Sequence, residues 1–318
     1  MQTDVAVSLL TAHKRNMRLM GNSFEITSVN NDVRFANISI DAAVNEISRI
    51  EFLLSTFKPE SQTNLINDNA GIQPVLVDRE VFDLIQRSIR ISGLTQGAFD
   101  ITYGSVDKRF WNFDVHMTSL PDPKIAAASV RLINYQNIVL DSENCTVFLR
   151  EKGMRIGFGG IGKGYAADRA KAVMQQLGIT SGIVNASGDL NAWGTQPNGD
   201  AWTIGIADPN GGRKHPLGSI NMSGLAVATS GNYEKYAAID GKKYSHTIDP
   251  KTGFPVSGIQ SVTIIAPNAE LADAMATPVM IMGIKAGLRL INQIKGLHCI
   301  IVDDAQKIYT SEQINIHH

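Results

Sequence analysis

The hydrophobic positions of this chain follow two repeats, the two-residue alternation of β-strands and the 3.6-residue spacing of α-helices. Stretches with one repeat are followed by stretches with the other along the sequence. Residues 23–29, "SFEITSV", alternate apolar and polar side chains and end in polar turn residues, which predicts a β-strand. Short apolar runs predict four more strands later in the chain, at 182–187, 202–207, 225–230 and 261–267.

Two helices are predicted in the N-terminal third of the chain. Apolar residues recur at helical spacing within 40–56, where Ser39 or Asp41 can cap the helix. A second helical stripe begins after Asp78, which is a cap residue, and Gly93 can stop it.

Two more helices are predicted in the second half. One starts near Lys163 and ends at Gly178. The other covers 268–283, where Asn268 can cap it and Pro278 must bend or interrupt it, because proline lacks a backbone N–H. Since strands and helices interleave irregularly, without a strict βαβ rhythm, the pattern favours the α+β class over a doubly wound sheet.

The composition narrows the function only by exclusion. Hydrophobic residues make up 43% of the 318 positions and charged residues 19%, which excludes a disordered chain. The formal net charge of -1 provides no bulk field that would recruit nucleic acid, so we predict no nucleic-acid partner. Cys145 and Cys299 lie far apart in the sequence, and we interpret both as buried apolar thiols.

The N-terminal region carries no export signal as the sequence is written. Residues 1–27 lack a basic segment followed by a long apolar run, and no apolar run in the chain approaches the length of a membrane span. We therefore predict a cytoplasmic protein with no transmembrane segment. A signal peptide removed beforehand would instead imply a periplasmic or membrane-anchored protein.

Residues 157–164, "GFGGIGKG", match two phosphate-binding patterns and complete neither. A P-loop requires Ser or Thr after its lysine, and here Gly164 follows Lys163. The dinucleotide fingerprint requires an acid at the end of the next strand, and none occurs there before Asp189. Both patterns share a glycine backbone that a ligand can approach closely and a helix N-terminus that can bind an anion. In this chain Lys163 adds a positive charge. Five glycines in eight residues are entropically costly in a simple turn, which favours a ligand.

A candidate metal site lies in the predicted 268–283 helix. Asp273 and Thr277 stand four positions apart, so a carboxylate and a hydroxyl share one helix face. Two hard oxygen donors suit Mg²⁺, while a Thr277 hydroxyl bonded back to the Asp273 carbonyl is the structural alternative. Thr229 and Ser230 offer further hydroxyl donors to a phosphate, or form only a polar turn.

Three isolated residues are also candidates for a functional role. His246 lies in an Asp-Pro turn, where it can act as an acid or base, as a stacking surface or as a structural residue. Asp100 lies between two apolar residues, and a polar group in an apolar setting needs a partner. Phe57 follows a helix end, where its ring either covers a planar ligand or joins the core.

Taken in order, these stretches resemble the ApbE family of flavin transferases. The resemblance spans roughly residues 20–283, and the collinear order of the segments makes it specific, although each segment alone is modest. It rests on "MGNSFEI", "LLSTFKPESQTNLIN", "GAFDIT" with "WNF" downstream, "GFGGIGKGYAADRA", "VNASGDL", "VATSGNYEKY", "YSHTIDPKTGFPV" and "SVTIIAPNAELADAMAT".

The resemblance implies a fold and a reaction. The fold would be one α+β domain over 1–318, made of two closely packed sub-domains with an FAD site in the cleft between them. FAD would bind as the substrate with Mg²⁺ on its pyrophosphate. A Ser or Thr hydroxyl of an acceptor flavoprotein, a redox subunit or a reductase, would attack the FMN-side phosphorus, and AMP would leave. Some members instead use water and hydrolyse FAD to FMN and AMP.

The resemblance also assigns site residues. The metal would be held by the Gly162 carbonyl and by the side chains of Asp273 and Thr277. Lys163 would lie against the nucleotide and assist catalysis, and His246 would assist deprotonation of the attacking hydroxyl. Met20 and Phe57 would flank the isoalloxazine, and the remaining nucleotide contacts would be Ala98, Phe99, Asp100, Gly157 and Ile248.

Three positions depart from the family pattern. Gly157 stands where many members have Asp, which removes a carboxylate from the nucleotide site. Ala276 stands where some members have a second acid beside the metal threonine, and Phe57 replaces a tyrosine. Gly157 and Ala276 motivate one alternative to the transferase, a flavin-binding protein with little turnover. The other alternative is an FAD pyrophosphatase on the same scaffold.

Overall fold

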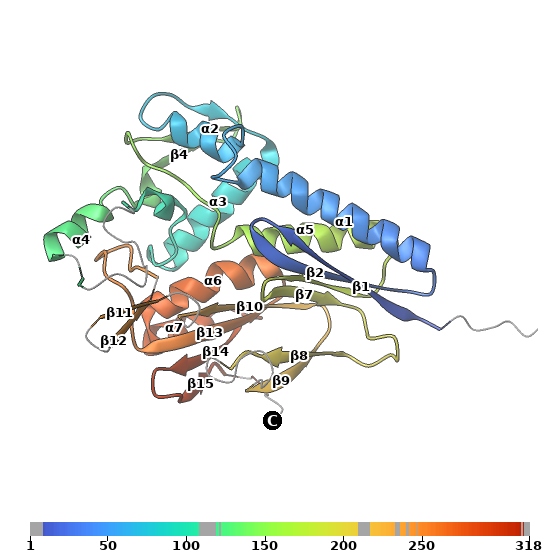
Figure 1. Ribbon diagram of the computed structural model, residues 1–318. Helices are drawn as coiled ribbons and strands as arrows, with labels where there is room; N and C mark the ends of the chain where they lie inside the picture. The colour runs from blue at the N-terminus through green and yellow to red at the C-terminus, as the bar shows by residue number, and fades with distance from the viewer. Residues whose placement is uncertain are drawn as a thin grey trace, which may run out of the picture.

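An antiparallel sheet forms the centre of the protein (Figure 1). The computed structural model describes residues 9–107, 119–120, 122–208, 217–232, 236–239, 242–245, 247–312 and 314. The sheet has eight strands in the order β1-β2-β6-β7-β10-β13-β14-β15, and all neighbours are antiparallel. Its strands are β1 (Thr11–Leu19), β2 (Asn22–Asn30), β6 (Gly182–Ala186), β7 (Asp189–Trp193), β10 (Leu225–Gly231), β13 (Ile259–Ala266), β14 (His298–Asp303) and β15 (Ile308–Thr310).

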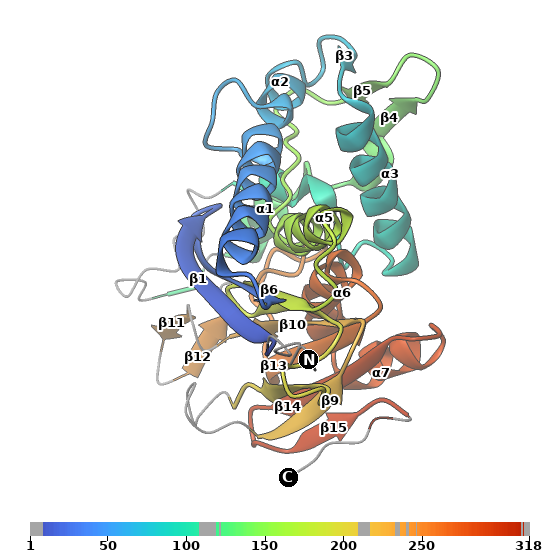
Figure 2. The same cartoon turned by 90° about the vertical axis from the view of Figure 1, so that its right-hand side faces the viewer.

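Helices cover one face of this sheet. Figure 2 looks along α5, which lies between α1 and α6, while α7 packs against β14. The apolar stripes of these helices and the facing strand residues form one large core, in which Ile47, Ala166 and Met275 are fully buried. The four helices are α1 (Val33–Leu54), α5 (Gly162–Gln176), α6 (Ala269–Met282) and α7 (Ile284–Asn292).

A two-stranded ribbon packs on the opposite face. Its strands are β8 (Trp202–Ile206) and β9 (Gly218–Met222), and Trp202 and Met222 join a second apolar cluster with strand residues such as Leu190. Because side chains alternate along a strand, Leu190 points to this ribbon while its neighbours Asp189 and Asn191 point to the helices. The sheet thereby delivers two polar side chains to the helix-covered face.

The remaining elements lie beyond α1 and α5, away from the sheet, and around one end of it (Figures 1 and 2). They include a small sheet in the order β3-β5-β4 and a hairpin of β11 and β12. Their bounds are α2 (Gln62–Asp68), β3 (Val75–Leu76), α3 (Arg79–Leu94), η1 (Ile101–Ser105), α4 (Pro123–Ser129), η2 (Tyr135–Asn137), β4 (Ile138–Asp141), β5 (Thr146–Leu149), β11 (Tyr236–Ile239) and β12 (Lys242–Ser245).

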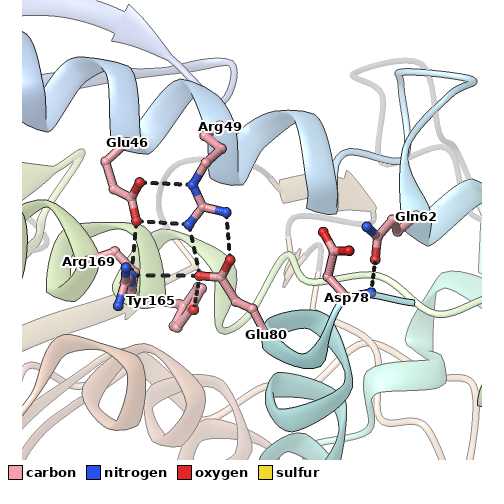
Figure 3. A network of polar contacts seen from close by, with 7 residues as sticks. All are labelled: Glu46, Arg49, Gln62, Asp78, Glu80, Tyr165 and Arg169. Carbon is pink, nitrogen blue, oxygen red and sulfur yellow. Dashed lines mark hydrogen bonds and ion pairs between the residues drawn. The ribbon is translucent and has the colours of Figure 1, made fainter. Parts of the chain in front are cut away.

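A partly buried polar network ties α1, α3 and α5 together (Figure 3). Arg49 of α1 binds Glu46 in its own helix at 2.8 Å and Glu80 of α3 at 2.6 Å. Arg169 of α5 lies 3.0 Å from Glu46 and 3.6 Å from Glu80, and the Tyr165 hydroxyl donates to Glu80. Two carboxylates thus face two guanidinium groups, and each charge contacts more than one opposite partner.

The structure confirms the α+β class and most of the predicted elements, but the first helix begins earlier than predicted. Asp32, rather than Ser39 or Asp41, caps α1 by accepting the N–H groups of Arg34 and Phe35. The buried stripe of α1 starts at Ala36, whose small side chain the hydrophobic pattern did not reveal. The Ser39 hydroxyl is buried inside the helix face and contacts the Ser28 hydroxyl.

Two smaller expectations also need correction. Cys299 is buried, but Cys145 is only half-buried and occupies a turn with φ of 51°. Gly93 does not stop α3, which continues to Leu94, and left-handed backbone follows at Gln96 and Gly97. Of the helices in the described ranges, none combines the length and the apolar character that a membrane crossing requires.

Candidate active site

The N-terminus of α5 is capped by another helix. The residue before α5, Ile161, has no polar side chain to accept the free N–H groups of the first turn. Instead, the Gly164 N–H donates to Asp273 Oδ2 of α6 over 3.0 Å. A carboxylate at this position also interacts favourably with the positive end of the helix dipole.

The N-terminus of α6 is capped in return by α5. Asp168 of α5 accepts the N–H groups of Ala269 and Glu270, both over 2.9 Å. The third free N–H, of Leu271, donates to the cap residue Asn268 over 2.9 Å. The two helices therefore hold each other at their first turns, and the position of Asp273 is fixed relative to the glycine loop.

The glycines of the loop serve close packing rather than unusual backbone angles. None of the five glycines in 157–164 has a positive φ. A Cβ on Gly164 would come within 2.1 Å of the Ala269 carbonyl oxygen, so only glycine lets α5 and α6 approach this closely. A Cβ on Gly162 would lie 3.1 Å from Phe158, whereas Gly159 has open space around it. The loop is therefore crowded at its helix side and open at Gly159.

Three charged side chains meet beside this helix end. Lys163 Nζ lies 3.0 Å from Asp189 Oδ2 and 3.4 Å from Asp273 Oδ1. Both carboxylates are buried, with 4% and 6% of the residue exposed, and the Lys163 side chain is 24% exposed. Two buried carboxylates therefore share one ammonium in the cluster.

Burial and mutual charge shift the pKa values in this cluster. Burial opposes the charge on Lys163, but the charges of Asp273 and Asp189 outweigh it and raise the lysine pKa above its ordinary value. Burial, followed by the charge of Asp273, raises the pKa of Asp189, while Lys163 and the Thr229 N–H oppose this rise. Lys163 is therefore a fixed positive charge at the glycine loop.

Asp189 is the site residue that the sequence reasoning missed. It begins β7 directly after a two-residue hairpin turn, in which Ser187 and Gly188 both have positive φ. In the linear sequence Asp189 stands out only as an acid too late for a dinucleotide fingerprint. The dipeptide Ser-Gly between two apolar runs was the available signal, because it predicts a hairpin and so a strand that starts at Asp189.

A pair of hydroxyls lies one helical turn from Asp273. The Thr277 hydroxyl pairs with that of Ser230 on β10 at 2.9 Å, and this partner replaces the Asp273 carbonyl that we considered as the structural alternative. Thr229 points to the other face of the strand, where it contacts Thr263 at 2.9 Å. Of the two candidate hydroxyls on this strand, the structure brings only Ser230 to Thr277.

The chemistry of these donors fits Mg²⁺. Asp189 Oδ2 is buried without a well-aligned hydrogen-bond donor, and Asp273 Oδ1 accepts a long hydrogen bond of 3.4 Å from Lys163, while Oδ2 accepts the Gly164 N–H. The hydroxyls of Thr277 and Ser230 satisfy each other and keep lone pairs. The described residues contain no cluster of three or more His, Cys, Asp or Glu side chains suited to a metal. Mg²⁺ typically uses one or two carboxylates together with waters and substrate phosphates, so the single carboxylate of Asp273 with the Thr277 hydroxyl is compatible with it.

Two of the predicted nucleotide residues lie directly against the glycine loop. The Met20 methyl would be 3.8 Å from a Cβ on Gly162, and the Phe99 ring 3.6 Å from a Cβ on Gly160. Met20 occupies a left-handed turn between β1 and β2, with φ of 50°, and its N–H donates to Glu51 over 3.1 Å. These contacts place one end of the first hairpin at the start of α5.

Other predicted residues follow the chain leading into the loop. The Gly157 N–H donates to the Ile101 carbonyl over 2.9 Å, next to Asp100, and the Tyr103 hydroxyl lies 3.4 Å from the Ile248 nitrogen. Buried Ala98 precedes this segment. The glycine loop, the 98–103 segment and Ile248 are therefore linked through successive contacts.

The Asp100 carboxylate is occupied within the protein, as its apolar setting requires. It accepts the N–H and hydroxyl of Thr102 and the N–H of Tyr135, at 2.8, 2.6 and 2.9 Å. Burial raises the pKa of Asp100, and these three hydrogen bonds oppose the rise. If Asp100 contacts a nucleotide, it must do so through its backbone, because its carboxylate is already bonded to residues of η1 and η2.

Two predicted residues stand apart from the packed site. Phe57 is 92% exposed, so it is not an ordinary core phenylalanine. Its ring contributes nothing to the core and is available to a planar ligand. His246 lies outside the described residues.

The fold and the site together define an α+β protein in which a lysine and two buried carboxylates meet at the glycine-rich start of a helix. Comparison with known proteins identifies the family. The ApbE family model matches residues 20–301, so the chain belongs to the ApbE family.

Relatives and solved structures agree with this assignment. An FAD:protein FMN transferase of Klebsiella pneumoniae (strain 342) is 34% identical over 266 residues, which cover 83% of this chain and 82% of the relative. One of Treponema pallidum (strain Nichols) is 29% identical, covering 86% and 81%. The crystal structure of the ApbE protein of Thermotoga maritima superposes with a TM-score of 0.86 at 32% identity, covering 95% and 97%. The flavin transferase ApbE of Vibrio cholerae, at 24% identity and a TM-score of 0.81, shares the fold.

Proposed function

We propose that this protein transfers FMN from FAD to a Ser or Thr hydroxyl of an acceptor flavoprotein, with Mg²⁺, and releases AMP. The observation that carries the proposal is the convergence of Lys163, Asp189 and Asp273 at the N-terminus of α5. Relatives that cover most of the chain carry the name FAD:protein FMN transferase.

In this proposal the N-terminus of α5 binds the phosphates of FAD. A helix N-terminus presents N–H groups to an anion, and Lys163 adds a positive charge that its two carboxylates keep protonated. The open space around Gly159 admits a ligand against the backbone of the loop. Since phosphoryl transfer depends on charge neutralisation and alignment, these groups supply what the reaction needs most.

In this proposal the residues around the glycine loop bind the flavin ring. Met20 and the exposed Phe57 ring would flank the isoalloxazine, and the segment from Ala98 to Asp100, with Gly157 and Ile248, would contact the rest of FAD. An aromatic ring that is 92% exposed is expected where a planar ligand stacks, because the ligand then covers it.

The metal would be held by the Asp273 and Thr277 side chains and the Gly162 carbonyl. When bound, Mg²⁺ neutralises charge on the pyrophosphate oxygens. Asp273 is well suited to this task, because Gly164 fixes its Oδ2 and only the long contact with Lys163, at 3.4 Å, competes for Oδ1.

The transfer step is balanced without another reactant. The acceptor hydroxyl oxygen forms a bond to the FMN-side phosphorus, and the bond between that phosphorus and the bridging oxygen breaks. AMP leaves with the bridging oxygen, and the proton of the hydroxyl passes to a base. We propose His246 as this base, since imidazole accepts protons near neutral pH.

Intact-mass spectrometry tests the proposal. The protein is mixed with FAD, Mg²⁺ and an acceptor domain of a redox subunit or a reductase, and AMP is followed in parallel. The expected result is an acceptor heavier by one FMN group, together with AMP. The matched control is the same acceptor with its target Ser or Thr changed to alanine.

Two other outcomes would contradict the transferase. AMP released at an equal rate with and without acceptor, and no change of acceptor mass, would identify an FAD pyrophosphatase. FAD binding without AMP would identify a flavin-binding protein with little turnover.

A further inference from the structure

Asp189 belongs neither to the proposed metal ligands nor to the proposed FAD contacts, so its buried position needs another explanation. Strand β7 carries it into the space between α5 and α6, where it is 4% exposed. Its Oδ2 lies 3.0 Å from Lys163 Nζ. A buried carboxylate is costly unless it is paired, so this residue is held in place for an interaction.

Of the two carboxylates that contact Lys163, Asp189 is the nearer. The lysine lies between two carboxylates, and its contact with Asp273, at 3.4 Å, is the longer one. Asp273 has two further tasks, because Gly164 occupies its Oδ2 and the proposed Mg²⁺ would take its Oδ1. An ammonium and a divalent cation repel each other and therefore compete for that one oxygen.

We infer that Asp189 is a positioning residue that holds Lys163 at the glycine loop and thereby leaves Asp273 free to bind the metal. This inference rests on the proposed function, because it concerns the same metal and phosphate site. In this arrangement each cation has its own carboxylate: Lys163 has Asp189, and the metal has Asp273. The lysine stays directed to the phosphate-binding end of α5 whether or not metal is bound.

The inference makes a specific prediction about metal binding. Without the Asp189 charge, Asp273 becomes the sole carboxylate for Lys163 in this cluster, so a metal must displace the lysine before it binds. Removal of the lysine then removes the competition. The effect of losing Asp189 on metal affinity should therefore depend on whether Lys163 is present.

A double-mutant cycle measures this dependence. The four proteins are the wild type, Asp189→Asn, Lys163→Met and the double variant, and the probe is Mn²⁺, which takes the same oxygen ligands as Mg²⁺ and whose free fraction is counted by electron paramagnetic resonance. We expect Asp189→Asn to weaken Mn²⁺ binding about tenfold when Lys163 is present, and about twofold or less in the Lys163→Met background. Near-ultraviolet circular dichroism checks the fold of each variant.

The other outcomes overturn the inference. Equal weakening in both backgrounds would mean that Asp189 binds the metal itself or acts on it by its own charge. No weakening in either background would mean that Asp189 does not serve the metal site. If Asp189→Asn does not fold, the same cycle with Asp189→Ser decides, since the serine side chain is uncharged, polar and smaller.

The cycle also separates this inference from the proposed function. A wild-type protein that binds no Mn²⁺ would overturn both the inference and the metal assignment. A wild-type protein that binds Mn²⁺ and flavinylates the acceptor, but whose variants show no dependence on Lys163, would overturn the inference alone.

Discussion

The Gly164 N–H donates a hydrogen bond to Asp273 over 3.0 Å, although the two residues lie 109 positions apart in the chain. One carboxylate therefore caps the helix that follows the glycine loop and also belongs to the proposed metal set. Structural and metal-binding roles of Asp273 can be separated, because an amide oxygen can still accept the Gly164 N–H but is a weaker ligand for Mg²⁺.

The first prediction compares Asp273→Asn with Asp273→Ala. Both variants should lose Mg²⁺-dependent AMP release, because neither keeps the carboxylate. Only the alanine variant should also lose stability, by about 1 kcal/mol, since it leaves the first turn of α5 without its cap. Urea unfolding and an AMP assay measure the two effects. Unchanged AMP release in either variant would contradict the metal assignment.

The second prediction concerns the close approach of α5 and α6. Gly164→Ala should destabilise the protein by about 1–3 kcal/mol, because the new methyl group would overlap the Ala269 carbonyl and force the helices apart. The matched control is Gly159→Ala in the same loop, where the methyl group meets open space. Thermal denaturation of the two variants should therefore differ, and equal melting temperatures would show that the helices adjust freely.

The third prediction concerns Phe57. Phe57→Ala should leave the melting temperature unchanged, because the ring is 92% exposed, and should weaken FAD binding. A stacked aromatic pair contributes about 0.5–1.5 kcal/mol, which corresponds to roughly 2- to 13-fold in affinity. Fluorescence titration with FAD measures the change, and Phe57→Tyr, which keeps the ring, should bind normally. A tyrosine variant as weak as the alanine variant would argue against stacking.

The fourth prediction is a pH dependence from the network between α1, α3 and α5. Hydrogen bonding by Arg49 lowers the pKa of Glu46, so Glu46 contributes stability above its unfolded pKa near 4.5 and loses that contribution as pH falls through the lower folded value. Glu46→Gln should therefore destabilise the protein at pH 7, and the difference from wild type should shrink in acid.

Urea unfolding across this pH range tests the sign. The control is Glu60→Gln, an exposed glutamate outside the ion pairs of the described residues. A deficit of Glu46→Gln that stays constant from neutral to acid pH would show that packing, rather than charge, accounts for it.

The fifth prediction concerns His246, which comes from the family resemblance alone. His246→Ala should slow FMN transfer by about 10²-fold or more, as expected for loss of a general base, and should change FAD affinity much less. Single-turnover rates and FAD titration distinguish the two effects. Equal losses of rate and affinity would identify His246 as a binding residue.

Local patterns in the sequence predicted most of the secondary structure because the relevant signals are short-range. The helix starts at Asp78 and Asn268 and the alternation in 23–29 each depend on a few neighbouring residues, and the structure confirms all three elements, although only Asn268 caps its helix with its side chain. The start of α1 was missed because Asp32 caps it ahead of the recognisable stripe. The eight-stranded order of the sheet was not predicted, since pairings such as β2 with β6 join distant segments.

The site was predicted in part for the same reason. Lys163 and the pair of Asp273 and Thr277 lie in motifs that a linear pattern displays, and the structure brings Lys163 within 3.4 Å of Asp273. Asp189 carries no motif of its own, and its role depends on a hairpin that turns it toward the helices. The reciprocal caps between α5 and α6 are tertiary contacts that no local signal reveals.

The cap that α6 gives to α5 has a consequence for how the protein is made. Translation delivers α5 first, and Asp273 follows Gly164 by 109 residues. Ribosomes add about 5–20 residues per second, so the glycine loop emerges with its helix end uncapped for roughly 5–20 seconds. The two helices can therefore exchange their reciprocal caps only after α6 has been synthesised, late in the chain.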